Sequence, residues 1–336
     1  MKKILSLLAL LYATTMLTAQ SAVILQHNGN ATAFYNNAAF QNACAAAVSG
    51  DTILLPGGFF TPPATIDKKL TIIGAGHHPD SSLVTKTTVI TGSITLLENA
   101  DGCFISGMRI EGYVRIPSGH SVDILTLSRL YITDRFLVEN GKKSVNGTVR
   151  ECIISGEFNS PGLEQFSITN NIFGYRIYDV KNSLIANNIF LAGDPIGEAV
   201  RSIYNLDNCV LRNNIFFKSV YDLYGFVSTQ IQHNVYANTP AMTGNFPTGN
   251  IFNVNTAALF VSYNNTGFAY SHDFHLTAPA NYVGTDATQV GLYGSIRPWK
   301  NGSVPAMPHI LSKLIAENAD AEGKIQVQVT VAAQNN

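Results

Sequence analysis

Arginine, tyrosine and carboxylate side chains recur at alternating positions in short apolar segments of this 336-residue chain. Ile177 and Ile203 are flanked by Arg176, Tyr178 and Tyr204. Successive side chains of a strand point to opposite faces, so the isoleucines are expected inside and their neighbours outside. Aromatic rings pack on the apolar faces of sugars, and guanidinium groups donate hydrogen bonds to hydroxyl or carboxylate groups. The pattern predicts a surface for a polysaccharide or cell-surface glycan, with an ordinary solvated sheet face as the alternative.

The stripe of outward side chains is predicted to cross six short strands. These strands span residues 113–116, 135–139, 162–164, 175–178, 202–205 and 222–226. We predict as substrate-binding residues Arg115, Glu164, Asp194, Arg201, Tyr204 and Tyr224. Asp194 and Arg201 belong to an insertion, residues 192–201, which we expect to form a wall at the edge of the stripe.

Four residues are candidates for catalysis, namely Arg176, Tyr178, Glu198 and Asp222. β-Elimination of a uronate polymer needs a base such as Arg, Lys or Tyr and a group that neutralises charge, for which calcium often serves. Hydrolysis needs two carboxylates roughly 5 to 10 Å apart. The acidic residues do not occur in a paired motif, and no zinc-type spacing is present. We therefore predict no metal site and no cofactor. Calcium binding is the alternative, although no calcium-binding motif supports it.

A four-residue phrase, Asn-Asn-Ile-Phe, predicts how these side chains are positioned. It occurs at residues 170–173, 187–190 and 213–216, with His-Asn-Val-Tyr following at residues 233–236. The second Asn recurs in steps of 17, 26 and 20 residues, which suits one turn of a parallel β-solenoid. The column continues upstream through Cys152, Leu130 and Met108.

The repeated asparagines are predicted to be structural. Coils of a parallel solenoid stack about 4.8 Å apart, so that equivalent amides meet and both donate and accept hydrogen bonds. We expect a buried amide ladder, formed by Asn171, Asn188, Asn214 and Asn234.

The N-terminus has the three parts of a secretory signal peptide. Lys2 and Lys3 precede an apolar run over residues 4–17, and Ala19 precedes the expected mature start at Gln20. The run is shorter than the roughly 20 apolar residues of a membrane span, so we expect no transmembrane anchor. The net charge of −1 argues against nucleic acid as a partner, because attraction to phosphate needs a clustered excess of Lys and Arg.

Buried thiols and solvated histidines are expected rather than disulfides or metal ligands. The four cysteines, Cys44, Cys103, Cys152 and Cys209, stand in apolar positions far apart in the chain. Cys is a good small core residue, so free thiols are favoured over pairing. His77 and His78 precede Pro79 in a predicted turn, where we expect them to be exposed to solvent.

The N-terminal region adds a family resemblance to this repeat. Residues 36–48 predict a short helix with Phe40 and Cys44 on one face. Together with the phrases Ser-Gly-Asp-Thr-Ile at 49–53 and Leu-Thr-Ile-Ile-Gly at 70–74, the repeat resembles the right-handed parallel β-helix, or pectin-lyase-like, superfamily. The segment at 273–294 resembles the closing part of secreted β-helix proteins of Bacteroidetes type. The resemblance implies chemistry on the outer face of one sheet, but the signatures of pectate lyases and polygalacturonases are absent.

The predicted fold is all-β, a single right-handed parallel β-helix with an N-terminal helical cap and a C-terminal β cap. The predicted segments are a signal peptide at 1–19, a capping segment at 20–50, the β-helix at 51–295 and a capping tail at 296–336. In the tail we expect a short helix near 311–317 and a strand at 324–331 that covers the last coil, because an open solenoid end exposes unpaired strand edges.

Three hypotheses about function follow from these features. The first is an exported protein, periplasmic, outer-membrane-associated or extracellular, that presents an extended face to glycans without strong catalysis. The second is a polysaccharide lyase, before a hydrolase, that uses the outward stripe. The third is a structural or adhesive surface protein. An enzyme needs converging ionisable groups with perturbed pKa values, whereas a glycan binder needs exposed aromatic and amide groups.

Overall fold

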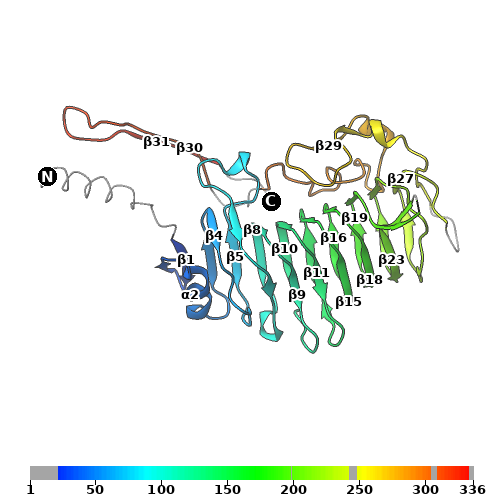
Figure 1. The fold of residues 1–336 in the computed structure, drawn as a ribbon, viewed down its shortest axis with the longest axis horizontal. Helices are drawn as coiled ribbons and strands as arrows, with labels where there is room; N and C mark the ends of the chain where they lie inside the picture. Colours follow the sequence, from blue (N-terminus) through cyan, green and yellow to red (C-terminus); the bar gives the residue numbers. More distant parts are fainter. Residues whose placement is uncertain (1–21, 198, 242–247, 304–308, 333–336) are drawn as a thin grey trace, which may run out of the picture.

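The computed structural model describes residues 22–197, 199–241, 248–303 and 309–332. It is an all-β parallel solenoid of about eight turns, as the repeat predicts, drawn lengthwise in Figure 1. The predicted signal peptide lies outside the described residues. In the described ranges, no helix combines the length and the hydropathy needed to cross a membrane.

The largest sheet consists mainly of two neighbouring stacks of parallel strands, with β1 (Val23–His27) and β2 (Asn30–Phe34) added in antiparallel fashion at the N-terminal end. The first stack comprises β3 (Thr52–Leu55), β5 (Thr71–Gly74), β8 (Phe104–Ile110), β10 (Thr126–Ile132), β13 (Thr148–Arg150), β16 (Ser167–Thr169), β19 (Leu184–Ala186), β24 (Val210–Arg212) and β26 (Gln230–Gln232). The second stack comprises β4 (Gly58–Phe60), β6 (Thr88–Ile90), β14 (Ile153–Ile154), β17 (Ile172–Phe173), β20 (Ile189–Phe190), β25 (Ile215–Phe216) and β27 (Val235–Tyr236). β8 and β10 are long enough to belong to both stacks.

A second sheet carries the predicted stripe. It comprises β7 (Ile94–Thr95), β9 (Val114–Ile116), β11 (Phe136–Val138), β12 (Ser144–Val145), β15 (Phe158–Glu164), β18 (Ile177–Lys181) and β23 (Ile203–Asp207). Five of the six predicted strands overlap strands of this sheet. The sixth, at 222–226, is wrong, because Asp222 forms only an isolated bridge to Ala241.

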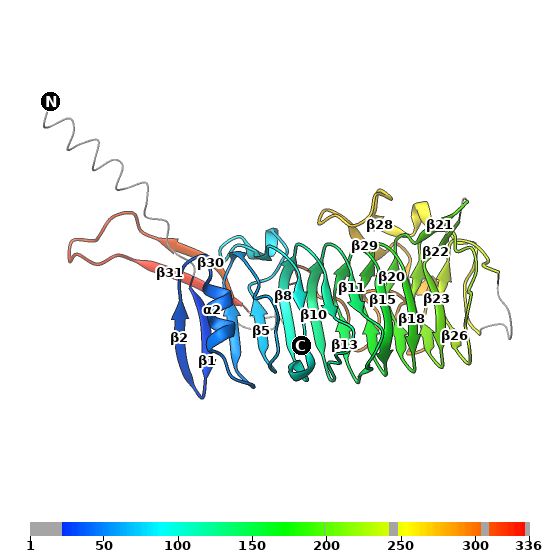
Figure 2. The same cartoon turned by 60° about the horizontal axis from the view of Figure 1, so that its bottom comes forward.

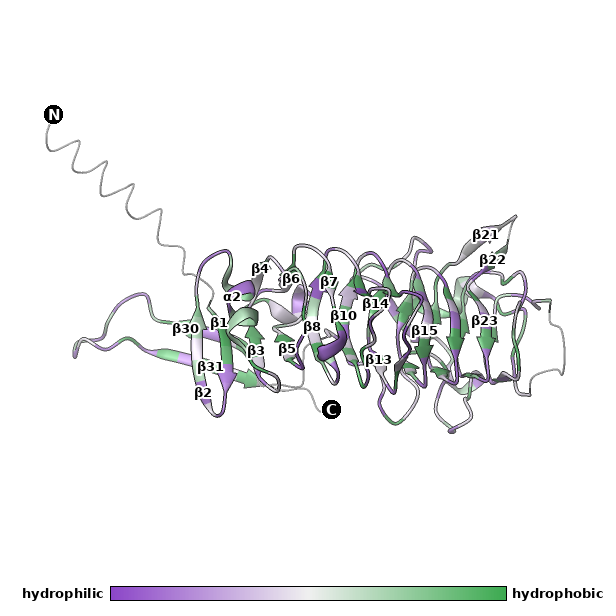
Figure 3. Ribbon diagram, turned by 90° about the horizontal axis from the view of Figure 1, so that it is seen from below, coloured by the Kyte–Doolittle hydropathy of each residue, from purple (hydrophilic) through white to green (hydrophobic). Residues whose placement is uncertain are grey.

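The interior of the coils is filled by apolar side chains from both sheets. Phe173, Phe190, Phe216 and Tyr236 stack on successive turns with ring centroids 4.6 to 5.1 Å apart. Figure 3 shows the hydrophobic residues repeating along the solenoid from one coil to the next. This stacking, rather than ion pairing, suits a chain with only 13% charged residues against about 25% in average proteins.

The predicted amide ladder is present at the bend between the two stacks. Asn188 Oδ1 accepts hydrogen bonds from the backbone N–H and the side-chain amide of Asn171, at 2.9 and 3.0 Å. Asn214 and Asn234 repeat these contacts, and Asn250 extends the ladder by one position that the sequence reading did not include. At the upstream end, Cys152 N–H donates to Asn171 Oδ1 at 2.9 Å, which confirms that Cys152 occupies the same column.

The residue before each ladder position has a left-handed backbone. The positive φ angles are those of Gly107, Arg129, Glu151, Asn170, Asn187, Asn213 and His233. Asn adopts this conformation at less cost than most side chains, because its short amide can hydrogen-bond locally. The first Asn of each phrase therefore makes the bend, and the second Asn forms the ladder.

Residues 254–303 leave the last described coil and run back along the solenoid (Figure 1). This return segment includes η3 (Thr256–Ala258), β28 (Phe260–Ser262), β29 (Asp273–Leu276) and η4 (Pro279–Asn281). It covers the outward isoleucines of the second stack and forms a second core, which comprises Ile153, Ile172, Ile189, Leu191, Ile215, Phe217, Val235, Leu259, Phe260, Phe274, Leu276, Val290 and Leu292.

The left-handed column holds the return segment in place. Asn170 Nδ2 donates to the carbonyl of Leu292 at 2.8 Å, and Asn213 Oδ1 accepts from the N–H of Thr285 at 2.9 Å. Gly291 has a φ of +76°, and a Cβ at this position would lie 2.6 Å from Ile215 Cδ1. Glycine therefore permits both the turn and the close approach to the isoleucine column.

The N-terminal end begins with β1 (Val23–His27) and β2 (Asn30–Phe34), an antiparallel pair. Helix α2 (Ala39–Ala46) lies within the predicted range 36–48 and buries Phe40 and Cys44 (Figure 2). Two 3₁₀ turns, η1 (Asp80–Ser82) and η2 (Glu98–Ala100), follow in later coils.

The C-terminal tail forms a separate hairpin. β30 (His309–Ile315) pairs with β31 (Val327–Ala332) in antiparallel fashion, so the helix predicted at 311–317 is wrong. The described side chains of both strands are exposed, and Figure 1 shows the hairpin at the end of the solenoid that carries β1. The prediction that this strand covers the last coil is therefore not confirmed.

Candidate functional site

The outer face of the second sheet brings most of the predicted site residues together. Tyr178 of β18 and Tyr204 of β23 are paired in register, and their rings stack with centroids 4.9 Å apart and an angle of 5°. We call the surface around them the tyrosine–arginine face; it comprises Glu157, Arg176, Tyr178, Arg201, Tyr204, Asp222 and Tyr224. Parallel strands place equivalent residues side by side, so the alternation in the sequence predicted this stack.

Arg176 is held by a carboxylate that the sequence reading missed. Its Nη2 and Nε atoms lie 2.6 and 3.2 Å from Glu157 Oε1. The hydroxyl of Tyr178 donates to Glu157 Oε2 at 3.2 Å, and the Arg176 guanidinium lies 5.1 Å from the Tyr178 ring centroid. Glu157 immediately precedes β15. The sequence analysis missed it because the predicted strand, at 162–164, began several residues later than β15 does.

Arg201 repeats this arrangement on the next coils. It forms a bidentate ion pair with Asp222, at 2.9 Å from Nε to Oδ1 and 3.0 Å from Nη2 to Oδ2. Its guanidinium lies 5.7 Å from the Tyr204 centroid and 5.1 Å from that of Tyr224. Tyr224 is 59% exposed, so this ring is the most open aromatic surface of the face.

Tyr178 and Arg201 are both held in their protonated forms. Burial, together with the charge of Glu157, raises the pKa of the Tyr178 hydroxyl to about 12. The hydrogen bond to Asp222 raises the pKa of Arg201 above its usual range. A general base must give up its proton near the working pH, so neither Tyr178 nor Arg201 is set up for that role.

The remaining predicted residues lie apart from the stack. Arg115 is on β9, in the same row as Tyr178 but three coils before it. Its Nη1 atom lies 3.5 Å from Glu139 Oε1. Glu164 is at the far end of β15, paired in register with Lys181, and its carboxylate lies 2.6 Å from Lys143 Nζ. The structure therefore does not place Glu164 beside Tyr178; Asn159 occupies that position.

The insertion at 192–201 forms a two-stranded hairpin next to this face. It comprises β21 (Asp194–Ile196) and β22 (Ala199–Arg201), which Figure 2 shows at the end of the solenoid opposite α2. Asp194 is a backbone partner of Arg201 across the hairpin. Glu198, a catalytic candidate, lies outside the described residues.

A shallow groove of about 420 Å³ adjoins the tyrosines. Its lining residues are Asn140, Pro161, Asp179, Lys181, Asn205, Asp207, Gly225 and Val227. Asp179, Asn205 and Gly225 directly follow Tyr178, Tyr204 and Tyr224 and all have positive φ angles. Asn205 Nδ2 donates to Asp179 Oδ1 at 2.9 Å. The sequence reading missed these groove residues, although their position after each tyrosine is a regular signal.

No arrangement for a metal ion is present in the part of the chain that the structure describes. No group of three or more His, Cys, Asp or Glu side chains gathers there in a way that could hold one. The carboxylates of the tyrosine–arginine face are engaged by arginines instead.

Comparison with known proteins adds no assignment. No protein-family model, no curated protein and no solved structure matched the chain. The parallel solenoid agrees with the fold that the resemblance implied, and the function must be argued from the site itself.

Proposed function

We propose that this protein is an exported, non-catalytic β-solenoid that binds an uncharged glycan along the tyrosine–arginine face and the groove beside it. The observation that carries the proposal is the exposed Tyr224, which directly precedes Gly225 in the lining of a groove that also has amide, carboxylate and ammonium groups. One open aromatic surface beside closely spaced donors and acceptors suits a polyhydroxylated chain.

The stacking geometry limits which surfaces a sugar could use. Tyr178 and Tyr204 occupy each other's ring faces, and arginines lie over both rings. Their edges and hydroxyls remain for a ligand. Arg201 also lies over the Tyr224 ring, at 5.1 Å from its centroid, but no aromatic ring of the described residues stacks on Tyr224 and its side chain is exposed, so Tyr224 offers the most accessible ring surface. We therefore expect Tyr224 to provide the stacking contact and the groove to provide the hydrogen bonds.

The charge balance favours a neutral polymer over a uronate. Arg176 and Arg201 are neutralised by Glu157 and Asp222. The groove itself has two carboxylates, Asp179 and Asp207, and one ammonium group, Lys181. An anionic chain would meet repulsion there, because like charges within a few ångströms disfavour binding.

The lyase alternative receives less support from this geometry. Elimination at a uronate requires a base and a cationic group free to neutralise the substrate carboxylate. The Tyr178 hydroxyl has a pKa of about 12, and both arginines are bound to carboxylates. Membership of the pectin-lyase-like superfamily and export of the chain through residues 1–19 are parts of the proposal that rest on sequence features alone.

Affinity electrophoresis of the chain from Gln20 onward, in gels containing neutral or uronate polysaccharides, tests the proposal. We expect retardation by a neutral polymer, lost in Tyr224→Ala and kept in Tyr35→Ala. Tyr35 is a matched control, because it is 52% exposed and precedes α2 at the other end of the solenoid. Absence of retardation, or equal loss in both variants, would contradict glycan binding on this face. Ultraviolet-absorbing unsaturated products would establish the lyase alternative instead.

A further inference from the structure

A cavity of about 220 Å³ lies between the solenoid and the return segment, on a different sheet from the tyrosine–arginine face. Three distant parts of the chain form it: the turn after β5, the loop and strand at 268–275, and residues 293–303. Ile153 and Ile172 of the outward column form its apolar floor. The fold thus assembles a half-open site from segments that only the return of the chain brings together.

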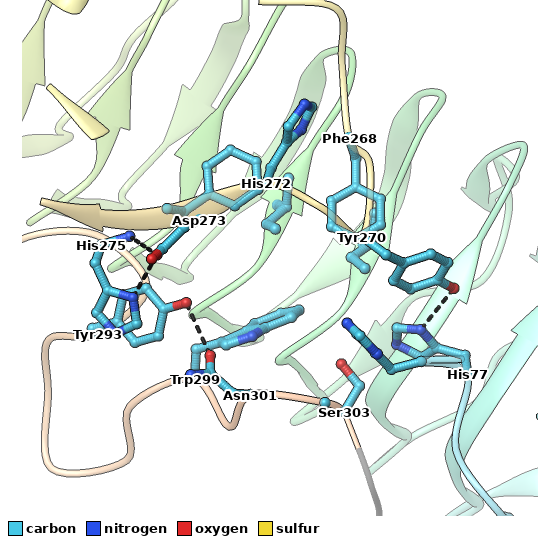
Figure 4. Close-up of a pocket in the computed structure, with 15 residues that line it drawn as sticks. His77, Phe268, Tyr270, His272, Asp273, His275, Tyr293, Trp299, Asn301 and Ser303 are labelled. Carbon is cyan, nitrogen blue, oxygen red and sulfur yellow. Dashed lines mark hydrogen bonds and ion pairs between the residues drawn. The ribbon is translucent and has the colours of Figure 1, made fainter. Parts of the chain in front are cut away.

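The walls of the cavity are aromatic. Figure 4 shows the Trp299 indole between Tyr293 on one side and the His77–Tyr270 pair on the other. Phe268 and Phe274 complete the wall, and His275 stacks on Tyr293 with centroids 3.6 Å apart. Flat apolar surfaces of this kind contact either an aromatic ring or the C–H face of a sugar.

One buried polar atom at the cavity has no partner among the described residues. His77 is only 2% exposed, and its Nδ1 lies 3.1 Å from the Tyr270 hydroxyl, while its Nε2 has no hydrogen-bond partner in the part of the chain that the structure describes. His272 also lines the cavity, but Figure 4 shows its ring directed away from Trp299 and His77. Leaving a buried polar atom unpaired costs about 1 to 3 kcal/mol, so such atoms in a cavity indicate a ligand that pairs with them.

The charges at the cavity are low or already compensated. Burial lowers the pKa of His77 to about 3, so its imidazole is neutral. The Asp273 carboxylate is engaged by both the backbone N–H and the ring of His275, at 2.9 and 2.6 Å. None of the described residues that line the cavity is Arg or Lys. Arg109 acts electrostatically on His77 and Tyr270, but it lies 3.4 Å from Glu111 and is not among the lining residues, so an anionic ligand would have no direct cationic partner in the cavity.

We infer that this cavity binds a single uncharged sugar ring, either a free monosaccharide or the terminal residue of a glycan. A sugar combines an apolar face for Trp299 with a hydroxyl for the Nε2 atom of His77, which a purely aromatic ligand cannot satisfy. Further hydroxyl partners are available at Asn301 and Ser303. The volume is below the roughly 300 to 1,000 Å³ of sites for drug-sized ligands, so one ring fits and a polymer does not.

The site is separate from the glycan face proposed above, and the two can be tested independently. Trp299 is the single tryptophan of the chain, so its fluorescence reports on the cavity alone. Titration of the full mature chain with glucose, galactose, mannose and N-acetylglucosamine should change this emission in a saturable way for at least one sugar. Isothermal calorimetry of the same sugar gives the affinity without relying on the fluorophore.

Variants assign the binding to the cavity. His77→Phe keeps a ring but removes Nε2, and should weaken binding by at least about tenfold. Ser303→Ala, which removes another hydroxyl partner, is the second variant in case His77→Phe does not fold, and Tyr35→Ala should leave sugar affinity unchanged. If the natural ligand is the terminal residue of a glycan, oligosaccharides should bind more tightly than the matching methyl glycoside. If it is a free monosaccharide, oligosaccharides should show no such gain in affinity.

Three results would overturn the inference. The first is no emission change and no heat with any neutral sugar. The second is equal binding of glucuronate, since the site has no cation for a carboxylate. The third is binding of phenol that His77→Phe and Ser303→Ala leave intact, which would make the cavity a purely aromatic site.

Discussion

Arg129 Nε donates a hydrogen bond of 2.9 Å to Glu151 Oε2 on the next coil, and the two side chains are only 3% and 4% exposed. Both residues have left-handed backbones, with φ angles of 51° and 53°. They occupy the positions that Asn170, Asn187 and Asn213 take in later coils. The bend between the two strand stacks is thus maintained by an ion pair upstream and by asparagines downstream.

Glu151→Gln should lower the free energy of unfolding by about 3 kcal/mol, because it leaves a buried guanidinium without its carboxylate. The double variant Arg129→Asn with Glu151→Asn should lose clearly less, since Asn tolerates the left-handed conformation and no unpaired charge remains. Urea unfolding followed by circular dichroism measures both. A double variant less stable than the single one would show that the ion pair itself, rather than the bend, is required.

The amide ladder gives a second prediction. Asn188→Ala removes the acceptor of the Asn171 N–H and the donor to the Ile168 carbonyl and to Asn214 Oδ1. Leaving these buried groups unpaired should cost at least about 3 kcal/mol of unfolding free energy. Asn99→Ala is the matched control, because Asn99 donates its side-chain amide to Asp67 on the exposed surface. Equal losses in the two variants would contradict a special role for the ladder.

The repeat made the solenoid and the ladder predictable, because stacking requires like residues at like positions. Cys152 could be assigned to the ladder column from alignment alone, and the structure confirms it. The first Asn of each phrase was not explained in this way. This Asn has two roles, a left-handed bend and a contact to residues 283–294. The contact depends on a segment about 100 residues later in the chain.

The site was predictable only where it followed strand alternation. Tyr178 and Tyr204 were placed correctly, whereas Glu157 was missed and Glu164 was put in the wrong row, because β15 is longer than its neighbours and its register shifts between Asn159 and Leu163. The prediction that His77 is exposed was wrong. Nothing near His77 in the sequence buries it; the loop with Tyr270, 193 residues later, does so.

The cysteines should be unreactive in the folded protein. All four are free and buried, and burial raises the pKa of Cys44 and Cys152 to about 12 and that of Cys103 to about 11. The thiolate is the reactive form, so at about pH 8 a disulfide reagent such as dithionitrobenzoate should label fewer than one thiol per chain. In denaturant it should label all four. Rapid labelling of the native chain would contradict the buried positions.

His77 should make stability depend on pH. Its pKa falls from about 6.5 in the unfolded chain to about 3 in the folded chain because the ring is buried. The unfolded state therefore binds a proton below about pH 6.5 that the folded state does not take up until about pH 3. The stabilising contribution is complete above this window and decreases as the pH falls through it, by up to about 1.4 kcal/mol per pH unit.

Urea unfolding of the wild-type chain and His77→Gln across this window measures that slope. The wild-type protein should lose more stability on acidification than His77→Gln, since the variant has no imidazole to protonate on unfolding. His120→Gln is the matched control, because the His120 side chain is 38% exposed. Parallel pH profiles for the wild type and His77→Gln would mean that water reaches His77 in the folded protein and that its ring is not buried there.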